Sequence, residues 1–390
     1  MILRKYIHQR LSLYYQQPKN AVVGSLLQSD HINFKRILGH WHWQRIFDTL
    51  YKKQEGQWLT PVELFKPHYS QVIANFIAKE ARNIDYGERI EVVEMGAGRG
   101  TNAKCVLDHL EHKHNELYRN IKYTIMDSSP TLLELQRDVL LSGENNHESK
   151  VNLEKVDVLD IAEGNSNFLK KSKDKTILVA MEVLDNLPHD KITTCRNTGV
   201  PLQANLVEDK ETGELQENFA PLKDPLLQNL IDTYPSYLPP TGYRWVPTIG
   251  AQMLRRLFEI RPNSSVVLAD FDYLPPPDIM STASQRRITK RADGEPLVTD
   301  MKDKDHECYL NTSELCDILF PTDFELLQQY VLNILPSNAY LNVEVMKQKD
   351  FLQEYGKNQI KNTTSWTGYS PLIEDFSNCS VLTVSNYKMD

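Results

Sequence analysis

Hydrophobic residues between positions 89 and 200 form short, β-branched runs that alternate with stretches of helical spacing. The run "RIEVVEM" at 89–95 is followed by "TNAKCVLDHLEH", in which Ala103, Val106, Leu107 and Leu110 share one helical face. This alternation predicts strands at 89–95, 121–127, 151–161 and 176–182, and helices at 101–112 and 128–141. Strands and helices in turn at this spacing are typical of a parallel, doubly wound α/β sheet.

The pattern changes on both sides of this region. Residues 31–88 have mostly helical periodicity, and residues 193–245 combine a hairpin pattern around "DKETGEL" with a stretch rich in Pro and Tyr. We interpret 193–245 as an inserted, substrate-side subdomain that separates the two halves of one sheet domain, 89–192 and 246–390. Within the second half, 275–307 is charged and free of aromatic residues. It is predicted to be a long, partly mobile loop.

The first 30 residues differ in composition from the rest. They contain four basic residues and no acid before Asp30, and Leu3, Ile7, Arg10 and Tyr14 recur at helical spacing. A basic, amphipathic segment of this kind predicts mitochondrial targeting, and hence a location in the matrix. On that interpretation residues 1–30 lie outside the fold. The alternative is a basic N-terminal helix that belongs to the folded domain.

Length, charge and cysteine spacing exclude several classes of protein. The chain has 390 residues, 41% of them hydrophobic, and a formal net charge of −8. The negative charge argues against a nucleic-acid binder, which would usually be basic. No apolar run approaches the ~20 residues that span a bilayer. The five cysteines are scattered without paired Cys or His spacing, so no metal site is predicted.

The stretch "VVEMGAGRGT" at 92–101 places three glycines directly after the first predicted strand. Glycine allows the backbone to approach a ligand, and the following helix offers free N–H groups. Dinucleotide enzymes use G-x-G-x-x-G here, but Thr101 stands where the third glycine would fall. Glu94 would be unfavourable beside a pyrophosphate and favourable beside a ligand with an ammonium and a sulfonium group. The turn therefore favours S-adenosylmethionine, while a tight turn without a ligand is the plainer alternative.

Carboxylates follow the other predicted strands. Asp127 ends the second strand, where it could accept hydrogen bonds from ribose hydroxyls. Asp157, with Asp160 as a competitor, falls near the end of the third and could line an adenine pocket. Glu182 and Asp185 follow the fourth strand, and ligands of open α/β sheets bind beyond the carboxyl ends of the strands. This pair could orient a cationic nucleophile, or it could only cap the next segment.

Several ordered motifs resemble the MidA-type class I methyltransferase family. The family pattern E-x-G-x-G-R-G-T is matched by "EMGAGRGT", with Ala97 where proline is usual, and a second pattern by "YTIMDSSPTLLELQ". "MEVLDNLP" keeps Glu182 and Asp185 of a third, and "DILFPTDFELL" and "QKDFLQEYG" match two more. Upstream, "WLTPVELF" is similar to a degenerate form of the family's S-P-E segment around Glu63. The similarity runs in order through residues 58–356.

The resemblance implies a Rossmann-like class I methyltransferase fold with S-adenosyl-L-methionine as its cofactor. Mitochondrial members of the family are complex I assembly factors and protein-arginine methyltransferases. It therefore implies an arginine-containing protein substrate, such as a subunit of a respiratory complex. The residues expected to bind the cofactor, within a cofactor-binding half at 89–192, are Glu94, Gly96, Ala97, Gly98, Gly100, Asp127, Ser128 and Asp157.

A guanidinium acceptor requires carboxylates, because arginine remains protonated in water and its lone pair is delocalised. Bidentate carboxylates could localise the charge away from the reacting nitrogen. We expect Glu182 and Asp185 to have this role, with Asp270 as a third candidate.

The sequence departs from the family on the substrate side. Asp190 stands where a histidine is expected, with His189 one place early; "DFD" at 270–272 replaces D-Y-G; and Pro321 replaces another histidine. Two other functions therefore stay open: a methyltransferase that acts on a small molecule or on another residue type, and a non-catalytic protein that binds the cofactor or only a partner and assists assembly.

Overall fold

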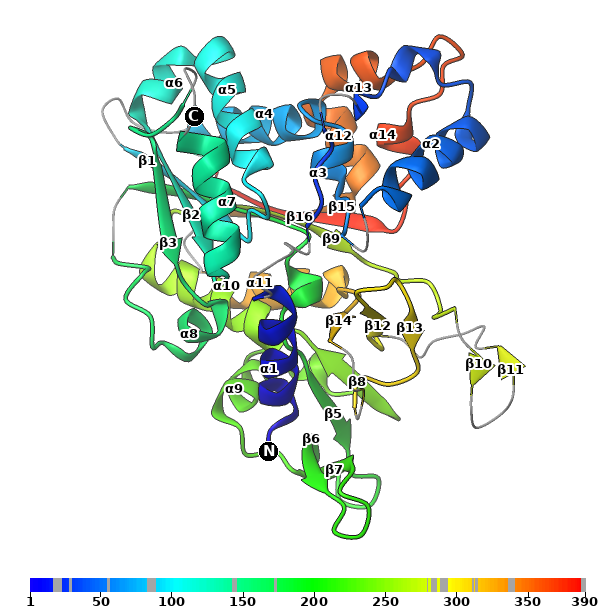
Figure 1. Cartoon of the computed structure of the whole chain (residues 1–390). Helices are drawn as coiled ribbons and strands as arrows, with labels where there is room; N and C mark the ends of the chain where they lie inside the picture. Colours follow the sequence, from blue (N-terminus) through cyan, green and yellow to red (C-terminus); the bar gives the residue numbers. More distant parts are fainter. Residues whose placement is uncertain are drawn as a thin grey trace.

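The computed structural model describes the chain except residues 17–22, 28–29, 55–56, 83–88, 142–145, 172–173, 279, 282–285, 288–293, 311, 313–314, 336–340 and 387–390. A mixed sheet of seven strands runs through the centre of the described part (Figure 1). Its spatial order is β15-β16-β9-β4-β1-β2-β3. The strands are β1 (Ile90–Met95), β2 (Ile121–Asp127), β3 (Val151–Lys155), β4 (Lys175–Met181), β9 (Ser265–Phe271), β15 (Leu341–Lys347) and β16 (Cys379–Asn386).

The predicted doubly wound α/β sheet is confirmed. β1 pairs in parallel with both β2 and β4, so the strand order reverses at β1. One strand differs from the prediction, because β16 runs antiparallel between β15 and β9. Hydrophobic alternation predicts a strand but not its direction, which depends on where the chain last crossed the sheet.

Helices cover both faces of the sheet because neighbouring strand residues point in opposite directions. Val92 faces a core formed with α4 and α5, while Val93 faces a core formed with α8 and α10. The first face carries α2 (His40–Lys52), α3 (Pro61–Leu64), α4 (His68–Ala81), α5 (Thr101–Lys113), α6 (Asn115–Asn120), α7 (Pro130–Leu141), α12 (Gln348–Tyr355), α13 (Lys357–Thr363) and α14 (Pro371–Glu374). The second face carries α8 (Val158–Glu163), α9 (Pro225–Thr233), α10 (Thr248–Ile260) and α11 (Phe324–Ile334).

The region between β4 and α10 is a separate antiparallel sheet with the order β7-β6-β5-β8. The hairpin predicted around "DKETGEL" is present, with the Asp209 N–H donating to the Glu214 carbonyl at 2.8 Å. The strands are β5 (Asp190–Thr194), β6 (Pro201–Glu208), β7 (Leu215–Pro221) and β8 (Tyr243–Val246). This sheet lies below the central sheet in Figure 1.

The prediction of one long loop at 275–307 is wrong for its second part. β12 (Leu297–Asp300) pairs with β13 (Asp305–His306) and with β14 (Cys316–Leu319). Val298 is buried in a hydrophobic cluster with residues of the N-terminal helix. Composition did not reveal this strand, because its four residues lie between charged stretches. In the first part, β10 (Met280–Ser281) and β11 (Arg286–Arg287) form a short ladder, and residues 279, 282–285 and 288–293 lie outside the described residues.

The interpretation of residues 1–30 as a segment outside the fold is also wrong for α1 (Leu3–Tyr15). Leu3 and Ile7 have no exposed surface and pack between the β5–β8 sheet and the β12–β14 sheet. Arg4 is buried and hydrogen-bonded to Asp190 and, at 2.9 Å, to Asp224. In Figure 1 the dark blue α1 lies in the lower part of the molecule, where it contacts β5, β6 and β14. The helix therefore belongs to the folded domain, as the alternative interpretation expected.

None of the described helices is both long enough and apolar enough to cross a membrane.

Candidate active site

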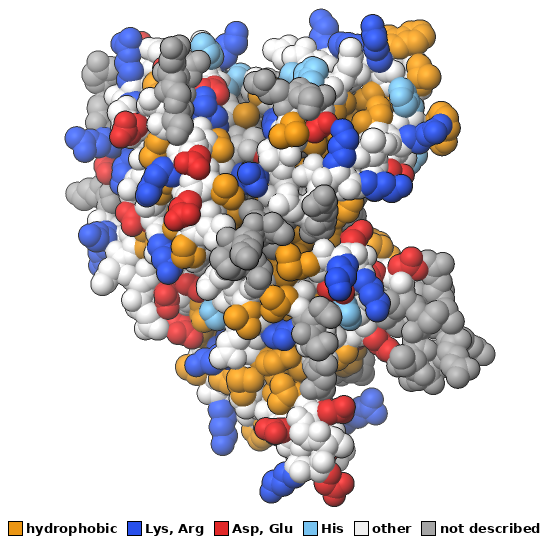
Figure 2. All heavy atoms as spheres, in the orientation of Figure 1, with side chains coloured by type: hydrophobic (Ala, Val, Ile, Leu, Met, Phe, Trp, Pro, Cys, Tyr) orange, Lys and Arg blue, Asp and Glu red, His pale blue; other side chains and the backbone are white. Residues whose placement is uncertain are grey.

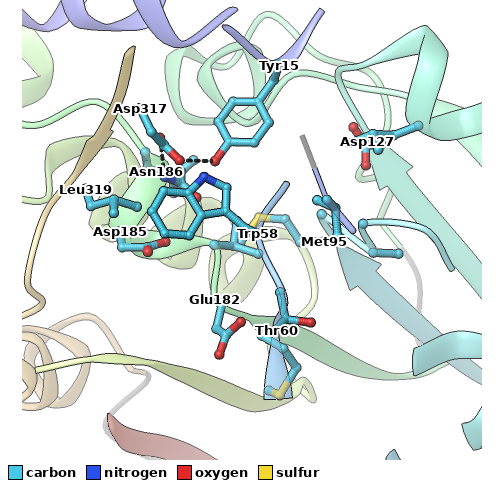
Figure 3. A pocket seen from close by; sticks show the side chains of 18 of the residues that line it. Tyr15, Trp58, Thr60, Met95, Asp127, Glu182, Asp185, Asn186, Asp317 and Leu319 are labelled. Atoms are coloured by element: carbon cyan, nitrogen blue, oxygen red, sulfur yellow. Dashed lines mark hydrogen bonds between the residues drawn. The ribbon is translucent and has the colours of Figure 1, made fainter. Parts of the chain in front are cut away.

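A cavity of about 450 Å³ lies at the carboxyl ends of β1, β2 and β4. This is where ligands bind in open α/β sheets, and its volume is within the usual range for small-molecule sites. Its walls come from the turn after β1, the segments after β2 and β4, β14, and two N-terminal segments, α1 and 58–63. Figure 3 shows side chains of these segments converging on the cavity.

The glycine turn forms one wall. Gly96, Gly98 and Gly100 have φ values of 63°, 53° and 86°, in the left-handed region that favours glycine. A Cβ atom on Gly96 would come within 2.9 Å of Val183, so the turn also needs the small residue for packing. Gly96, Ala97 and Gly98 line the cavity as predicted. Gly100 does not; it precedes α5, and a Cβ there would come within 3.2 Å of the Gln136 Cα.

Glu94 lies beneath this turn, and neither of its oxygens is free. Its carboxylate accepts from Asn102 Nδ2 at 2.9 Å and from the Tyr123 hydroxyl at 2.7 Å. Burial raises the pKa of Glu94 to about 7, and nearby Asp127 contributes. The side chain lines the cavity, and its charge can attract a cation.

Asp127 and Ser128 line the cavity at the end of β2, as expected. The Asp127 carboxylate accepts from the Ser129 N–H and from Gln136 Nε2, both at 2.9 Å. These bonds fix the carboxylate and leave lone pairs that can accept from hydroxyl groups of a ligand. Burial raises the pKa of Asp127 to about 6.

Asp157 also lines the cavity, but it is not at the end of a strand. The predicted third strand stops at Lys155, and Asp157 is the N-cap of α8, accepting from the Leu159 N–H at 2.8 Å. Its other oxygen lies 3.3 Å from His8 Nε2 on α1. The predicted strand was too long because the short helix α8, which is apolar on one side, continues the alternation of apolar and polar residues.

These residues fit the nucleoside and amino-acid parts of S-adenosylmethionine. A glycine-lined wall permits close approach, and carboxylates at the ends of β1 and β2 can meet hydroxyl and ammonium groups.

A second group of carboxylates lies beyond β4. Glu182 has φ +56°, a strained conformation for a residue with a side chain. Within the described part of the chain, Glu182 Oε1 and Asp185 Oδ1 are buried without a hydrogen-bond partner. Burial, with Asp270 next, raises the pKa of Glu182 to about 8 and that of Asp185 well above its usual range. Unpartnered buried carboxylate oxygens are costly and mark a place for a donor-rich ligand.

Asp270 does not have the predicted clamp position, because it is absent from the described cavity wall. Its Oδ2 accepts from the backbone N–H groups of Val183 and Asp185, each at 3.1 Å, and its Oδ1 accepts from the Phe271 N–H at 2.7 Å. Asp270 is therefore a positioning residue that holds the strained turn carrying Glu182.

The motifs did not assign roles to three further cavity residues: Asp317 on β14, Tyr15 on α1, and Trp58. Asp317 accepts from the Tyr15 hydroxyl and from Asn186 Nδ2, both at 3.0 Å. Burial raises the pKa of Asp317 to about 7. Asp317 could have been found, since it opens the matched stretch "DILFPTDFELL". Tyr15 could not, because its segment was placed outside the fold.

Asp190, which stands where the family has a histidine, has a structural role. Asp190 is the buried partner of Arg4 and does not line the cavity. His189 stacks on Phe320 with ring centroids 4.2 Å apart, and burial lowers its pKa to about 4. The substituted position therefore attaches α1 to the fold.

The cavity wall is acidic although the outer surface is mixed. The face seen in Figure 2 carries acidic and basic side chains interspersed. The described wall carries Glu63, Glu94, Asp127, Asp157, Glu182, Asp185 and Asp317, against Arg99 and His8 as basic side chains. Glu63 is paired with Lys66 at 2.9 Å, and Arg99 donates to the Val23 carbonyl at 3.2 Å. Among the described residues, no three His, Cys, Asp or Glu side chains are grouped as metal ligands.

Comparisons with known proteins agree with this geometry. A sequence family described as "Putative S-adenosyl-L-methionine-dependent methyltransferase" matches residues 72–340. Among solved structures, a Burkholderia thailandensis superfamily member bound to S-adenosyl-homocysteine has a TM-score of 0.60 at 16% identity. The alignment covers 99% of this chain and 88% of that one. An uncharacterized protein of the same superfamily and organism has a TM-score of 0.60 at 14% identity, covering 99% and 87%. No curated protein matched.

The chain belongs to this family of S-adenosylmethionine-dependent methyltransferases, since the match covers more than half of its length. Its cofactor is S-adenosyl-L-methionine.

Proposed function

We propose that this methyltransferase modifies the guanidinium group of an arginine side chain in a partner protein. The observation that carries the proposal is a pair of residues on the cavity wall, Glu182 and Asp185, whose oxygens Oε1 and Oδ1 are buried without a hydrogen-bond partner among the described residues. A guanidinium group has five N–H donors in a planar fork that suits two carboxylates. The family resemblance also favours an arginine acceptor.

The cavity residues have distinct tasks in this mechanism. Gly96 and Gly98 provide a wall without side chains, and Asp127 is placed to hold ribose hydroxyls. The bound cofactor supplies an electrophilic methyl group on its sulfonium. Glu182 and Asp185 hold the guanidinium, align one nitrogen and draw positive charge to the other two. The proton that this nitrogen must lose passes to a carboxylate, and we assign that role to Asp185.

The partner and the compartment are parts of the proposal that depend on the family resemblance. We infer a subunit of a respiratory complex in the mitochondrial matrix. Import would have to leave α1 attached, since Leu3 and Arg4 are buried in the folded domain. A nucleic-acid partner is not proposed, because the net charge is −8.

The test compares mitochondrial proteins from cells with and without the chain by mass spectrometry, searching for a methylarginine that disappears. A Glu182→Gln variant should fail to restore it, with transfer reduced roughly 100-fold or more, because the charge that holds the acceptor is lost. Calorimetry with S-adenosyl-homocysteine should give nearly the wild-type affinity. Glu116→Gln, an exposed site on α6, is the matched control. Wild-type methylation by the Glu182 variant would exclude the clamp.

A small-molecule acceptor is the second candidate. The observation that favours it is the cover formed by α1 and Trp58 over a cavity of about 450 Å³. Loss of a methylated metabolite, with methylarginine unchanged, would support this candidate. A non-catalytic assembly protein would show neither loss.

A further inference from the structure

We propose that Trp58, with Tyr15 and Asp317, forms an acceptor subsite that binds a planar cation on the indole face. This inference rests on the proposed function and deepens it. It assigns recognition of the acceptor to residues from the N-terminal part of the chain and from β14.

The indole of Trp58 is held in place at its polar edge. Its Nε1 donates to the Tyr14 hydroxyl at 2.9 Å, and its backbone carbonyl accepts from the Gly24 N–H at 2.8 Å. Tyr51 packs against the ring edge-on, with centroids 6.4 Å apart. Because the single N–H of the indole is already used, what Trp58 offers to the cavity is its apolar, electron-rich surface.

Two carboxylates line the same cavity as this surface. In Figure 3 the indole lies among Tyr15, Asp317 and Asp185, and all four residues line the same cavity. The Tyr15 hydroxyl donates to Asp317 Oδ2 at 3.0 Å, and Asn186 donates to Oδ1 at 3.0 Å. Asp317 is thus kept in one orientation at the rim of the indole.

An aromatic face beside carboxylates selects for cations in two ways. The ring attracts a cation through its quadrupole, and the carboxylates attract it through charge and hydrogen bonds. A guanidinium is weakly hydrated and planar, so it can stack on the indole while its edge meets the carboxylates. A neutral urea group of nearly the same shape keeps N–H donors, but it loses the charge that both the ring and the carboxylates attract.

The end of α1 holds two residues of this subsite in place. Tyr14 positions Trp58, and the next residue, Tyr15, positions Asp317. The Tyr15 carbonyl also accepts from the Ser129 hydroxyl at 3.0 Å, beside Asp127 at the nucleoside end. The end of α1 therefore connects the two ends of the cavity.

The experiment uses the full chain saturated with S-adenosyl-homocysteine. Calorimetry compares N-acetyl-arginine-methylamide with N-acetyl-citrulline-methylamide, which has nearly the same shape and no charge. The variants are Trp58→Leu and Trp58→Phe, and Trp366→Leu is the control because Trp366 is 74% exposed on a distant loop. We expect the arginine amide to bind to the wild type and to the Trp366 variant. Binding should be roughly tenfold weaker in Trp58→Leu than in the wild type. The affinity of Trp58→Phe should lie between that of the wild type and that of Trp58→Leu.

Three results would overturn the subsite: no binding of the arginine amide, equal binding of the citrulline amide, or unchanged affinity in Trp58→Leu. Affinity for S-adenosyl-homocysteine is measured in every variant. Its loss in Trp58→Leu alone would indicate damage to the fold, and Trp58→Phe then decides. If methylarginine is never found in cells although the arginine amide binds through Trp58, the proposed function fails while the subsite stands.

Discussion

The two ends of the cavity are built in different ways. The nucleoside end comes from the eight residues 94–101 and from Asp127, on two neighbouring parallel strands. The acceptor end combines Glu182 and Asp185 after β4 with Asp317 on β14, Trp58, and Tyr15 on α1. The first end is a local strand–turn–helix structure, which residues close together in the sequence can form. The second exists only after four distant segments have packed together.

The ends also differ in how their carboxylates are satisfied. Both oxygens of Glu94 and both of Asp127 have hydrogen-bond partners within the protein. At the acceptor end, Glu182 Oε1 and Asp185 Oδ1 have none among the described residues. The carboxylates of the nucleoside end, like Asp317 at the acceptor end, are therefore preorganised. Glu182 and Asp185 are the carboxylates that we expect a ligand to complete.

The largest effect should come from removing the anchor of α1. Arg4→Met leaves Asp190 and Asp224 buried without their partner and should lower the free energy of unfolding by about 3–5 kcal/mol. Lys5→Met is the control, since Lys5 is exposed on the same helix. Urea unfolding of the full chain measures both. Equal stability of the two variants would mean that α1 contributes little to the acceptor end.

The pH dependence should separate the two ends. Asp127 and Glu94, with pKa values raised to about 6 and about 7, ionise before Glu182, whose pKa is raised to about 8. Cofactor affinity should therefore level off near neutral pH. Acceptor turnover, kcat/KM, should continue to rise by up to roughly tenfold per unit until about pH 8. Steady-state kinetics and calorimetry from pH 6 to 9 check this, and parallel profiles would contradict it.

Stability should change in the opposite direction. The folded pKa values of Glu182 and Asp317 lie above the usual carboxyl value of about 4, so the folded chain retains protons that the unfolded chain has released. This contribution is complete below about pH 4 and is lost as the pH rises through about 8. Thermal unfolding temperatures should fall over this window, and less steeply in Glu182→Gln.

A smaller effect should come from the glycine turn. In Gly96→Ala a Cβ with φ +63° would lie 2.9 Å from Val183, which should cost about 1–3 kcal/mol and weaken cofactor binding. Gly213→Ala, in the β6–β7 hairpin, has φ +72° and no atom within 4 Å of the new Cβ. The Gly213→Ala variant therefore measures the cost of backbone strain without the cost of crowding. If calorimetry shows the same cofactor affinity for both, the turn does not depend on close approach.

The smallest effect should be at Asp157. Asp157→Ala removes the N-cap of α8 and should lower stability by about 1 kcal/mol, whereas Asp157→Asn retains the cap. If Asp157 also contacts the cofactor, the Asn variant should bind it a few-fold more weakly while keeping its stability. Unchanged binding in Asp157→Asn would restrict the residue to capping.

Much of the fold and the nucleoside end could be predicted from local pattern. The runs that became β1, β2, β4 and β9 are apolar enough to be buried on both faces, and the glycines mark their turn without knowledge of the rest. The prediction failed for α1, whose burial depends on distant partners, and for β12, whose four residues lie between charged stretches. Asp270 was misassigned because strand position cannot reveal which N–H groups a carboxylate meets.

The sequence by itself determined the doubly wound sheet, the glycine turn and the carboxylates that follow each strand, because hydrophobic period and backbone freedom are properties of neighbouring residues. Only the tertiary structure decided that a basic N-terminal helix is part of the core, and that Tyr15, Trp58 and Asp317 meet around one cavity. Such meetings depend on the whole path of the chain, and on the desolvation of charges such as Arg4 that are tolerated only when their partners arrive.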